Sequence, residues 1–62
     1  MPVVTVEMFS GRTDEQKEKL ISGITKAFEE IGVKPDSLTI LIHEMPKGNW
    51  GIRGVQASKS NP

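Results

Sequence analysis

A chain of only 62 residues has little apolar material from which to build a core of its own. A domain of this size buries only about 60% of the surface that its unfolded chain exposes, so its stability is marginal. Disulfides or a structural metal often compensate, but the sequence has no cysteine and a single histidine. Association with further copies is the remaining route to stability. We therefore expect a single domain over residues 1–62 that forms a homo-oligomer and holds no metal.

The charge pattern argues against nucleic acid and membrane as partners. Eight basic and eight acidic side chains cancel, and the basic ones are spread along the chain rather than clustered. The amino terminus lacks the basic stretch and apolar run of a signal peptide, and no apolar segment approaches membrane-spanning length. We expect a cytoplasmic protein, a location with which the lack of cysteine is compatible.

A strand followed by a helix is predicted in the first half of the chain. Residues 3–9 are β-branched and apolar, which is typical of a strand. Thr13 and Gln16 have the spacing of a capping box, so a helix should begin there, and Gly32 suits the position just past its end. The apolar residues at helical spacing are Leu20, Ile21, Ile24, Ala27, Phe28 and Ile31.

A second strand and a hairpin are predicted in the second half. Residues 38–45 are almost continuously apolar and β-branched, the pattern of a strand covered on both faces. The intervening helix is long enough for a right-handed crossover, so the strands should be parallel. Residues 46–54 are rich in turn formers and should lead into a short hairpin, followed by a polar tail over 57–62. The expected fold class is α+β: one βαβ unit with two parallel strands, one amphipathic helix and a C-terminal hairpin.

The amino-terminal proline is the main candidate for chemistry. Removal of Met1 would leave Pro2 with a free secondary amine at the start of the first strand. A model α-amino group titrates near ~7.7 to 8.0, a prolyl amine is expected to be more basic, and an apolar pocket lowers either value. Such an amine can take a proton from one atom of a substrate and return it to another. A proline at the first residue of a strand also has a purely structural explanation.

Several segments in the same order resemble the 4-oxalocrotonate tautomerase (2-hydroxymuconate tautomerase) family of the tautomerase superfamily. They are Met1-Pro2 before a β-branched strand, residues 11–17, residues 44–52 and residues 57–59. The resemblance implies a tautomerase (MIF-like) fold and a hexamer built as a trimer of dimers. It also implies isomerisation of 2-hydroxymuconate-type dienols to conjugated ketones without a cofactor, as part of aromatic hydrocarbon catabolism.

The resemblance assigns roles to individual residues. Pro2 corresponds to the family's catalytic base, and Arg12 to a substrate-binding arginine that a neighbouring subunit contributes. A guanidinium binds a carboxylate through two parallel hydrogen bonds, which suits Arg12 to this role. Trp50 corresponds to the aromatic residue that helps to form the apolar wall of the pocket around the family's proline. Phe9 and Ile52 match positions lining the same pocket, although core packing explains both equally well.

One position departs from the family pattern. A second substrate-binding arginine of well-known members aligns here with Thr39, whose hydroxyl can donate a hydrogen bond but supplies no charge. We hypothesise that Arg53 provides the missing cation from a different backbone position.

Other interpretations stay open from the sequence alone. Within the superfamily they are phenylpyruvate enol tautomerisation on a 2-keto acid and decarboxylation. Water addition to haloacrylates needs additional polar residues that position water, and the sequence shows no such set. Outside catalysis, the chain could be a silent oligomeric scaffold. His43 has no carboxylate partner apparent in the sequence, so we interpret it as a structural or surface residue. Glu7 and Glu44 would form a carboxylate pair only if the two strands placed them side by side, which we do not expect.

Overall fold

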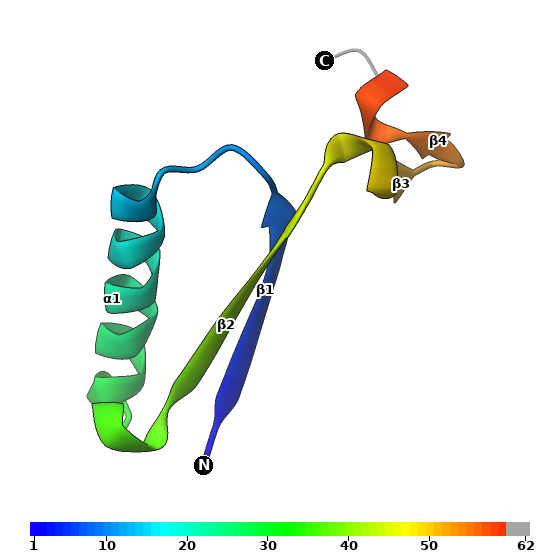
Figure 1. Ribbon diagram of the computed structural model, residues 1–62. Coiled ribbons are helices and arrows are strands. Elements are labelled where there is room, and N and C mark those ends of the chain that lie inside the picture. The colour runs from blue at the N-terminus through cyan, green and yellow to red at the C-terminus, as the bar shows by residue number, and fades with distance from the viewer. Residues whose placement is uncertain (60–62) are drawn as a thin grey trace.

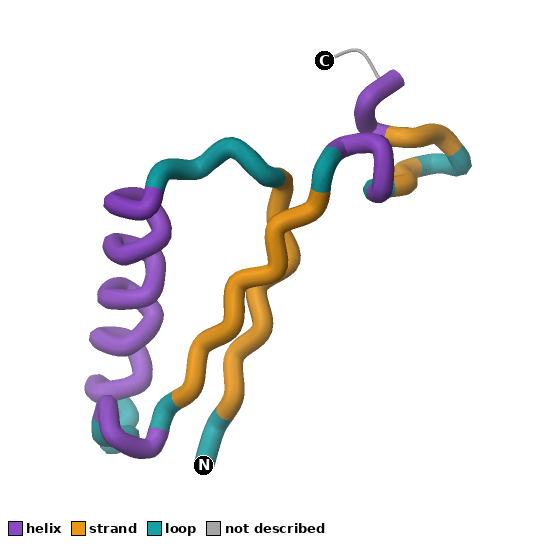
Figure 2. Tube along the Cα trace, viewed as in Figure 1, coloured by secondary structure: helices purple, strands orange, loops and turns teal. Residues whose placement is uncertain are grey.

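The computed structural model describes residues 1–59, which form a βαβ unit and a separate small hairpin (Figures 1 and 2). The longer elements are β1 (Val3–Phe9), α1 (Asp14–Glu30) and β2 (Thr39–Met45). β1 and β2 pair in parallel, whereas β3 (Gly51–Ile52) and β4 (Val55–Gln56) pair antiparallel. The predicted α+β architecture is confirmed. No helix within residues 1–59 is both long enough and apolar enough to span a membrane.

Two predicted boundaries differ from the structure in detail. β2 begins at Thr39 rather than Leu38, because the Leu38 N–H donates to the Pro35 carbonyl (3.2 Å) and closes a 3-10 helix at Pro35–Ser37. The predicted polar tail begins as a 3-10 helix at Ala57–Lys59, and its remaining residues, 60–62, lie outside the described part of the chain. A further 3-10 helix, Lys47–Asn49, precedes the hairpin.

The predicted capping box fixes the start of α1. The Thr13 hydroxyl accepts a hydrogen bond from the Gln16 backbone N–H (3.1 Å), and the Gln16 side-chain carbonyl accepts one from the Thr13 N–H (3.0 Å). These two bonds satisfy donors that a helix start leaves unpaired. Gly11, at φ 123°, supplies the left-handed turn between β1 and this cap.

One face of the β1–β2 sheet packs against α1. The strand residues on this face are half-buried: Val4, Val6, Met8, Ile40 and Ile42. The helix contributes Leu20, Ile24 and Phe28, which recur every fourth residue and are half-buried as well. The set of apolar residues predicted to lie on the packed face of the helix was therefore too large. Ile31, for example, follows the last residue of α1 and is 74% exposed.

The opposite face of the sheet has no cover within residues 1–59. Alternation places Val3 and Leu41 on this open face, where they are 61% and 44% exposed. No apolar side chain of the described residues is fully buried, and Figure 1 shows α1 on only one side of the strands. The prediction that β2 is covered on both faces thus requires another chain. This supports the expected homo-oligomer.

The hairpin extends away from the βαβ unit at the end of β1 and β2 opposite the amino terminus (Figure 1). The described chain is consequently elongated, with dimensions of 42 × 23 × 16 Å. The Ala57 N–H donates to the Trp50 carbonyl (2.7 Å), and the Gln56 side-chain amide donates to the Gly48 carbonyl (2.9 Å). These bonds hold the hairpin and its two flanking 3-10 helices together as one arm.

We predict that Leu41→Lys prevents assembly, because it places a charge on the face that association would remove from water. Sedimentation should show a species of lower mass, with a lower unfolding temperature, than the wild-type chain. Ile31→Lys is the matched control, since Ile31 is an exposed apolar residue away from this face. Equal masses for wild type and Leu41→Lys would show that the open face is not an interface.

Candidate active site

Pro2 and Thr39 lie together at the amino-terminal end of the sheet. Thr39 pairs with Val3, and its N–H donates to the Pro2 carbonyl (3.1 Å). Pro2 is half-buried, whereas Met1 is 94% exposed and thus open to an aminopeptidase. Loss of Met1 would convert the Pro2 nitrogen from an amide into an amine and leave the bond to Thr39 in place.

Arg12 lies at the other end of β1, in the turn between Gly11 and the helix cap. It lines a groove of about 270 Å³ together with Met8, Gln16, Lys17 and Leu20. The groove therefore has an apolar floor and a cationic rim. Within residues 1–59 no carboxylate forms an ion pair with Arg12, so its guanidinium is available to an anion.

The aromatic side chains meet at this same end. Phe9 and Trp50 have ring centroids 4.5 Å apart and an interplanar angle of 57°. The Lys47 ammonium lies 5.5 Å from the centre of the Phe9 ring, within the range of a cation–π interaction. The structure thus brings together two residues that the sequence assigned to one pocket wall, and Ile52 follows in the adjoining β3 with 45% of its surface exposed.

Arg53 is held in an unfavourable backbone conformation at the tip of the hairpin. Ile52 pairs with Val55, which leaves Arg53 and Gly54 as a two-residue turn with φ of 55° and 81°. Positive φ at both positions is typical of a type I′ turn. A left-handed conformation at a non-glycine residue costs roughly 1–2 kcal/mol. Arg53 is exposed and belongs to the arm, so one chain does not bring it to Thr39.

The predicted site residues therefore form two groups at opposite ends of β1. A seven-residue strand spans about 20 Å, and Figure 1 shows the amino terminus and the arm at opposite ends of the strands. Pro2 cannot share a substrate with the Arg12 or Trp50 of its own chain across this distance. A site that contains all of them needs residues from at least two chains.

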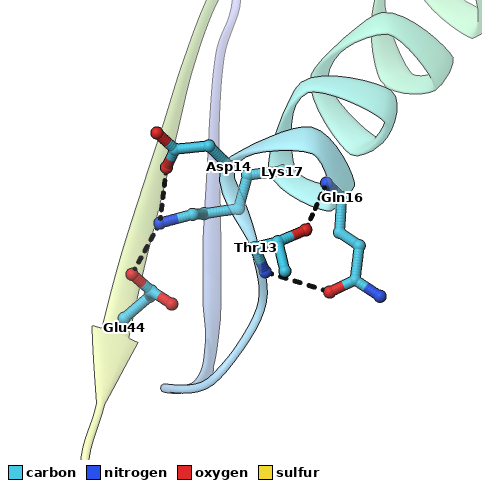
Figure 3. A network of polar contacts seen from close by, with 5 residues as sticks. All are labelled: Thr13, Asp14, Gln16, Lys17 and Glu44. Carbon is cyan, nitrogen blue, oxygen red and sulfur yellow. Dashed lines mark hydrogen bonds and ion pairs between the residues drawn. The ribbon is translucent and has the colours of Figure 1, made fainter.

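A polar network joins the start of α1 to the end of β2 (Figure 3). The Lys17 ammonium donates to Glu44 Oε1 (2.9 Å) and lies 3.6 Å from Asp14 Oδ1. The hydrogen bond to Glu44, with smaller contributions from Asp14, raises the pKa of Lys17 above its ordinary value of 10.5. Our sequence reasoning missed this network. Asp14 and Lys17 are three residues apart in a helix, which was the available signal.

His43 has a carboxylate partner that was not apparent from the sequence, and with 51% of its side chain exposed it is a surface residue, as interpreted. Its Nδ1 lies 3.0 Å from Glu7 Oε2, because the strand register places Glu7 directly opposite His43 on the open face. The expectation that Glu7 and Glu44 do not pair is confirmed, since Glu44 faces α1. Among residues 1–59, no group of three or more His, Asp or Glu side chains is placed to hold a metal ion.

Comparison with known proteins identifies the family. A family model described as "Tautomerase enzyme" matches residues 2–59. The 2-hydroxymuconate tautomerase of Comamonas testosteroni is 40% identical over 60 residues, 95% of each chain. That of Bacillus subtilis is 41% identical over 59 residues, 94% of this chain and 95% of the relative. The crystal structure of YwhB, a homologue of 4-oxalocrotonate tautomerase, matches with a TM-score of 0.90 at 38% identity, covering 97% of this chain and 100% of that one.

This chain belongs to the tautomerase family of enzymes. It is an isomerase of the keto–enol tautomerase type, and the resemblance noted in the sequence is confirmed.

We predict that the Lys17 ion pair stabilises the fold at neutral pH and stops doing so in strong alkali. Because folding raises the pKa of Lys17, its contribution is complete below 10.5 and is lost as the pH rises through the folded-state pKa. The difference in unfolding free energy between wild type and Lys17→Met should be equal at about pH 7 and pH 9 and smaller at about pH 11.5. Urea unfolding at fixed protein concentration measures it, with Lys19→Met as control. A difference that is unchanged at all three pH values would contradict the prediction.

Proposed function

We propose that the chain, after removal of Met1, converts 2-hydroxydienoates such as 2-hydroxymuconate to the conjugated ketone with Pro2 as general base. The catalyst is a cytoplasmic homo-oligomer, most simply a hexamer arranged as a trimer of dimers, and it uses no cofactor. The observation that carries the proposal is the full-length likeness to two 2-hydroxymuconate tautomerases. Because Pro2 and Arg12 lie at opposite ends of one strand, the proposal requires a site shared between subunits.

The proposed reaction moves one proton. The neutral Pro2 amine accepts the proton of the enol hydroxyl, the O–H electrons form the ketone, and the dienol π electrons shift toward carbon. The prolinium then returns a proton to that carbon, so the amine is regenerated. Arg12 of a neighbouring subunit binds a substrate carboxylate through two hydrogen bonds. Phe9 and Trp50 of a neighbouring subunit exclude water from around Pro2, which disfavours the prolinium cation and keeps the base neutral.

A substrate with a single carboxylate is the second candidate, and Thr39 is the observation that favours it. Thr39 N–H is already bonded to the Pro2 carbonyl, so the residue offers the substrate only its hydroxyl. The enol of a 2-keto acid such as phenylpyruvate needs no second cation. The two candidates differ in whether Arg53 of another subunit reaches the site.

We predict that Pro2→Ala and Arg12→Ala each lose at least about a hundredfold of 2-hydroxymuconate ketonisation. Mixing the two variants after unfolding and refolding should restore part of the activity. A mixed oligomer contains sites with Pro2 from one chain and Arg12 from the other. Each variant refolded alone is the control, and an ultraviolet assay measures turnover. Full loss in both variants with no recovery on mixing would contradict a site shared between subunits.

We predict that Arg53→Gly stabilises the fold and weakens substrate binding. Glycine removes the cost of positive φ, about 1–2 kcal/mol, but adds conformational freedom to the unfolded chain, so the unfolding free energy should rise by up to about 1 kcal/mol. Loss of the cation should raise KM for the dicarboxylate. Arg53→Lys is the matched variant, because it keeps the charge and the backbone cost. Thermal unfolding and steady-state kinetics measure the two effects. An unchanged KM in Arg53→Gly would show that Arg53 is not part of the substrate-binding site.

A further inference from the structure

The segment that carries Arg12 contacts the end of β2 both before and after Arg12 in the chain. Before Arg12, the Ser10 N–H donates to the Met45 carbonyl (3.0 Å). After it, the Lys17 ammonium donates to the carboxylate of Glu44, the residue next to Met45. Arg12 lies between these two contacts. Its backbone position relative to the sheet therefore depends on both of them.

The Lys17–Glu44 contact is less exposed to water than the Lys17–Asp14 contact. The side chains of Lys17 and Glu44 are 25% and 29% exposed, whereas that of Asp14 is fully exposed at 104%. Fully exposed pairs contribute little because water and salt screen them. The partly desolvated pair with Glu44 is thus the stronger contact, and Asp14 is a secondary partner at 3.6 Å.

Lys17 and Arg12 differ in whether their charge is already compensated within the chain. Both line the same groove, but Lys17 is ion-paired with Asp14 and Glu44, whereas Arg12 has no ion-pair partner among residues 1–59. Of the two cations, Arg12 is therefore the one available to a substrate carboxylate, which a guanidinium binds strongly through its paired donors.

We propose that Lys17 is a positioning residue for Arg12: by binding Glu44, it fixes the turn from which the Arg12 guanidinium binds a substrate carboxylate. This inference rests on the part of the proposed function in which Arg12 binds a carboxylate. Lys17 itself does not contact the substrate. Its effect must therefore disappear when Arg12 is absent.

The test is a double-mutant cycle between positions 17 and 12. Lys17→Met, Lys17→Arg and the control Lys19→Met are made in the wild-type chain and in Arg12→Ala. Two quantities are measured: KM and kcat for 2-hydroxymuconate, and the calorimetric Kd for adipate, a saturated dicarboxylate of the same chain length. Native mass and thermal unfolding check that each variant folds and assembles.

In the wild-type background, Lys17→Met should raise both KM and the adipate Kd about threefold to tenfold, with kcat changed by less than about twofold. Lys17→Arg keeps a charged donor for Glu44, so KM and the adipate Kd should stay near their wild-type values. Lys19→Met should leave both values unchanged. In Arg12→Ala, Lys17→Met should have no further effect. If Lys17→Met fails to assemble, Glu44→Gln removes the same contact from the strand side and should give the same pattern.

Two results would overturn the inference. If Lys17→Met raises the adipate Kd by the same factor in the wild-type chain and in Arg12→Ala, Lys17 binds the ligand directly or acts only on stability. If Lys17→Met leaves the adipate Kd of the wild-type chain unchanged, the Lys17–Glu44 contact has no role in binding. Failure of the proposed function is distinguishable from these. If 2-hydroxymuconate is not turned over but the adipate Kd values follow the expected pattern, the proposed substrate is wrong and the positioning role of Lys17 stands. If Arg12→Ala leaves the adipate Kd unchanged, Arg12 does not bind the carboxylate and both proposals are wrong.

Discussion

A two-stranded sheet covered by one helix leaves one of its two faces in water, and the other properties of this chain depend on that imbalance. The strands alternate apolar residues on both faces, yet α1 covers only the face that carries Val4, Val6 and Met8. The open face carries Val3 and Leu41 beside the Glu7–His43 pair. The apolar burial that a domain of 62 residues lacks must come from contact between chains. The separation of Pro2 from Arg12 along the same strand makes the proposed site depend on that contact as well.

The arrangement also explains why so many polar contacts gather at one corner of the molecule. The turn between β1 and α1 carries the proposed anion-binding residue, and a turn has no regular hydrogen-bond ladder to hold it. The turn is held instead by three contacts: the capping box, the Ser10–Met45 bond and the Lys17–Glu44 pair. These contacts are local and short, so they fix the turn without the buried core that the chain cannot build.

Elements with local signals were predictable, whereas contacts that depend on strand register or helix packing were not. The helix start followed from the Thr13–Gln16 spacing, and the hairpin from its turn formers, because both are decided within a few residues. The Glu7–His43 and Lys17–Glu44 pairs join residues 36 and 27 positions apart. The Glu7–His43 pair exists only for one alignment of β1 with β2, and the Lys17–Glu44 pair only for one packing of α1 against β2. Neither segment of a pair could reveal it alone. For the site, the resemblance supplied Pro2, Arg12 and Trp50, but their separation into two ends required the three-dimensional structure.

Charge balance at the proposed site bears on which substrate it accepts. A dicarboxylate brings two negative charges, and Arg12 can neutralise one of them. The second carboxylate would meet the Thr39 hydroxyl, which can donate one hydrogen bond but supplies no positive charge to neutralise it. Transfer of an unpaired carboxylate into an apolar, water-excluded pocket is costly. A dicarboxylate is therefore favoured only where a cation from another segment reaches the same pocket. The cation that we propose is Arg53 of another subunit, which is exposed at the hairpin tip in a strained turn.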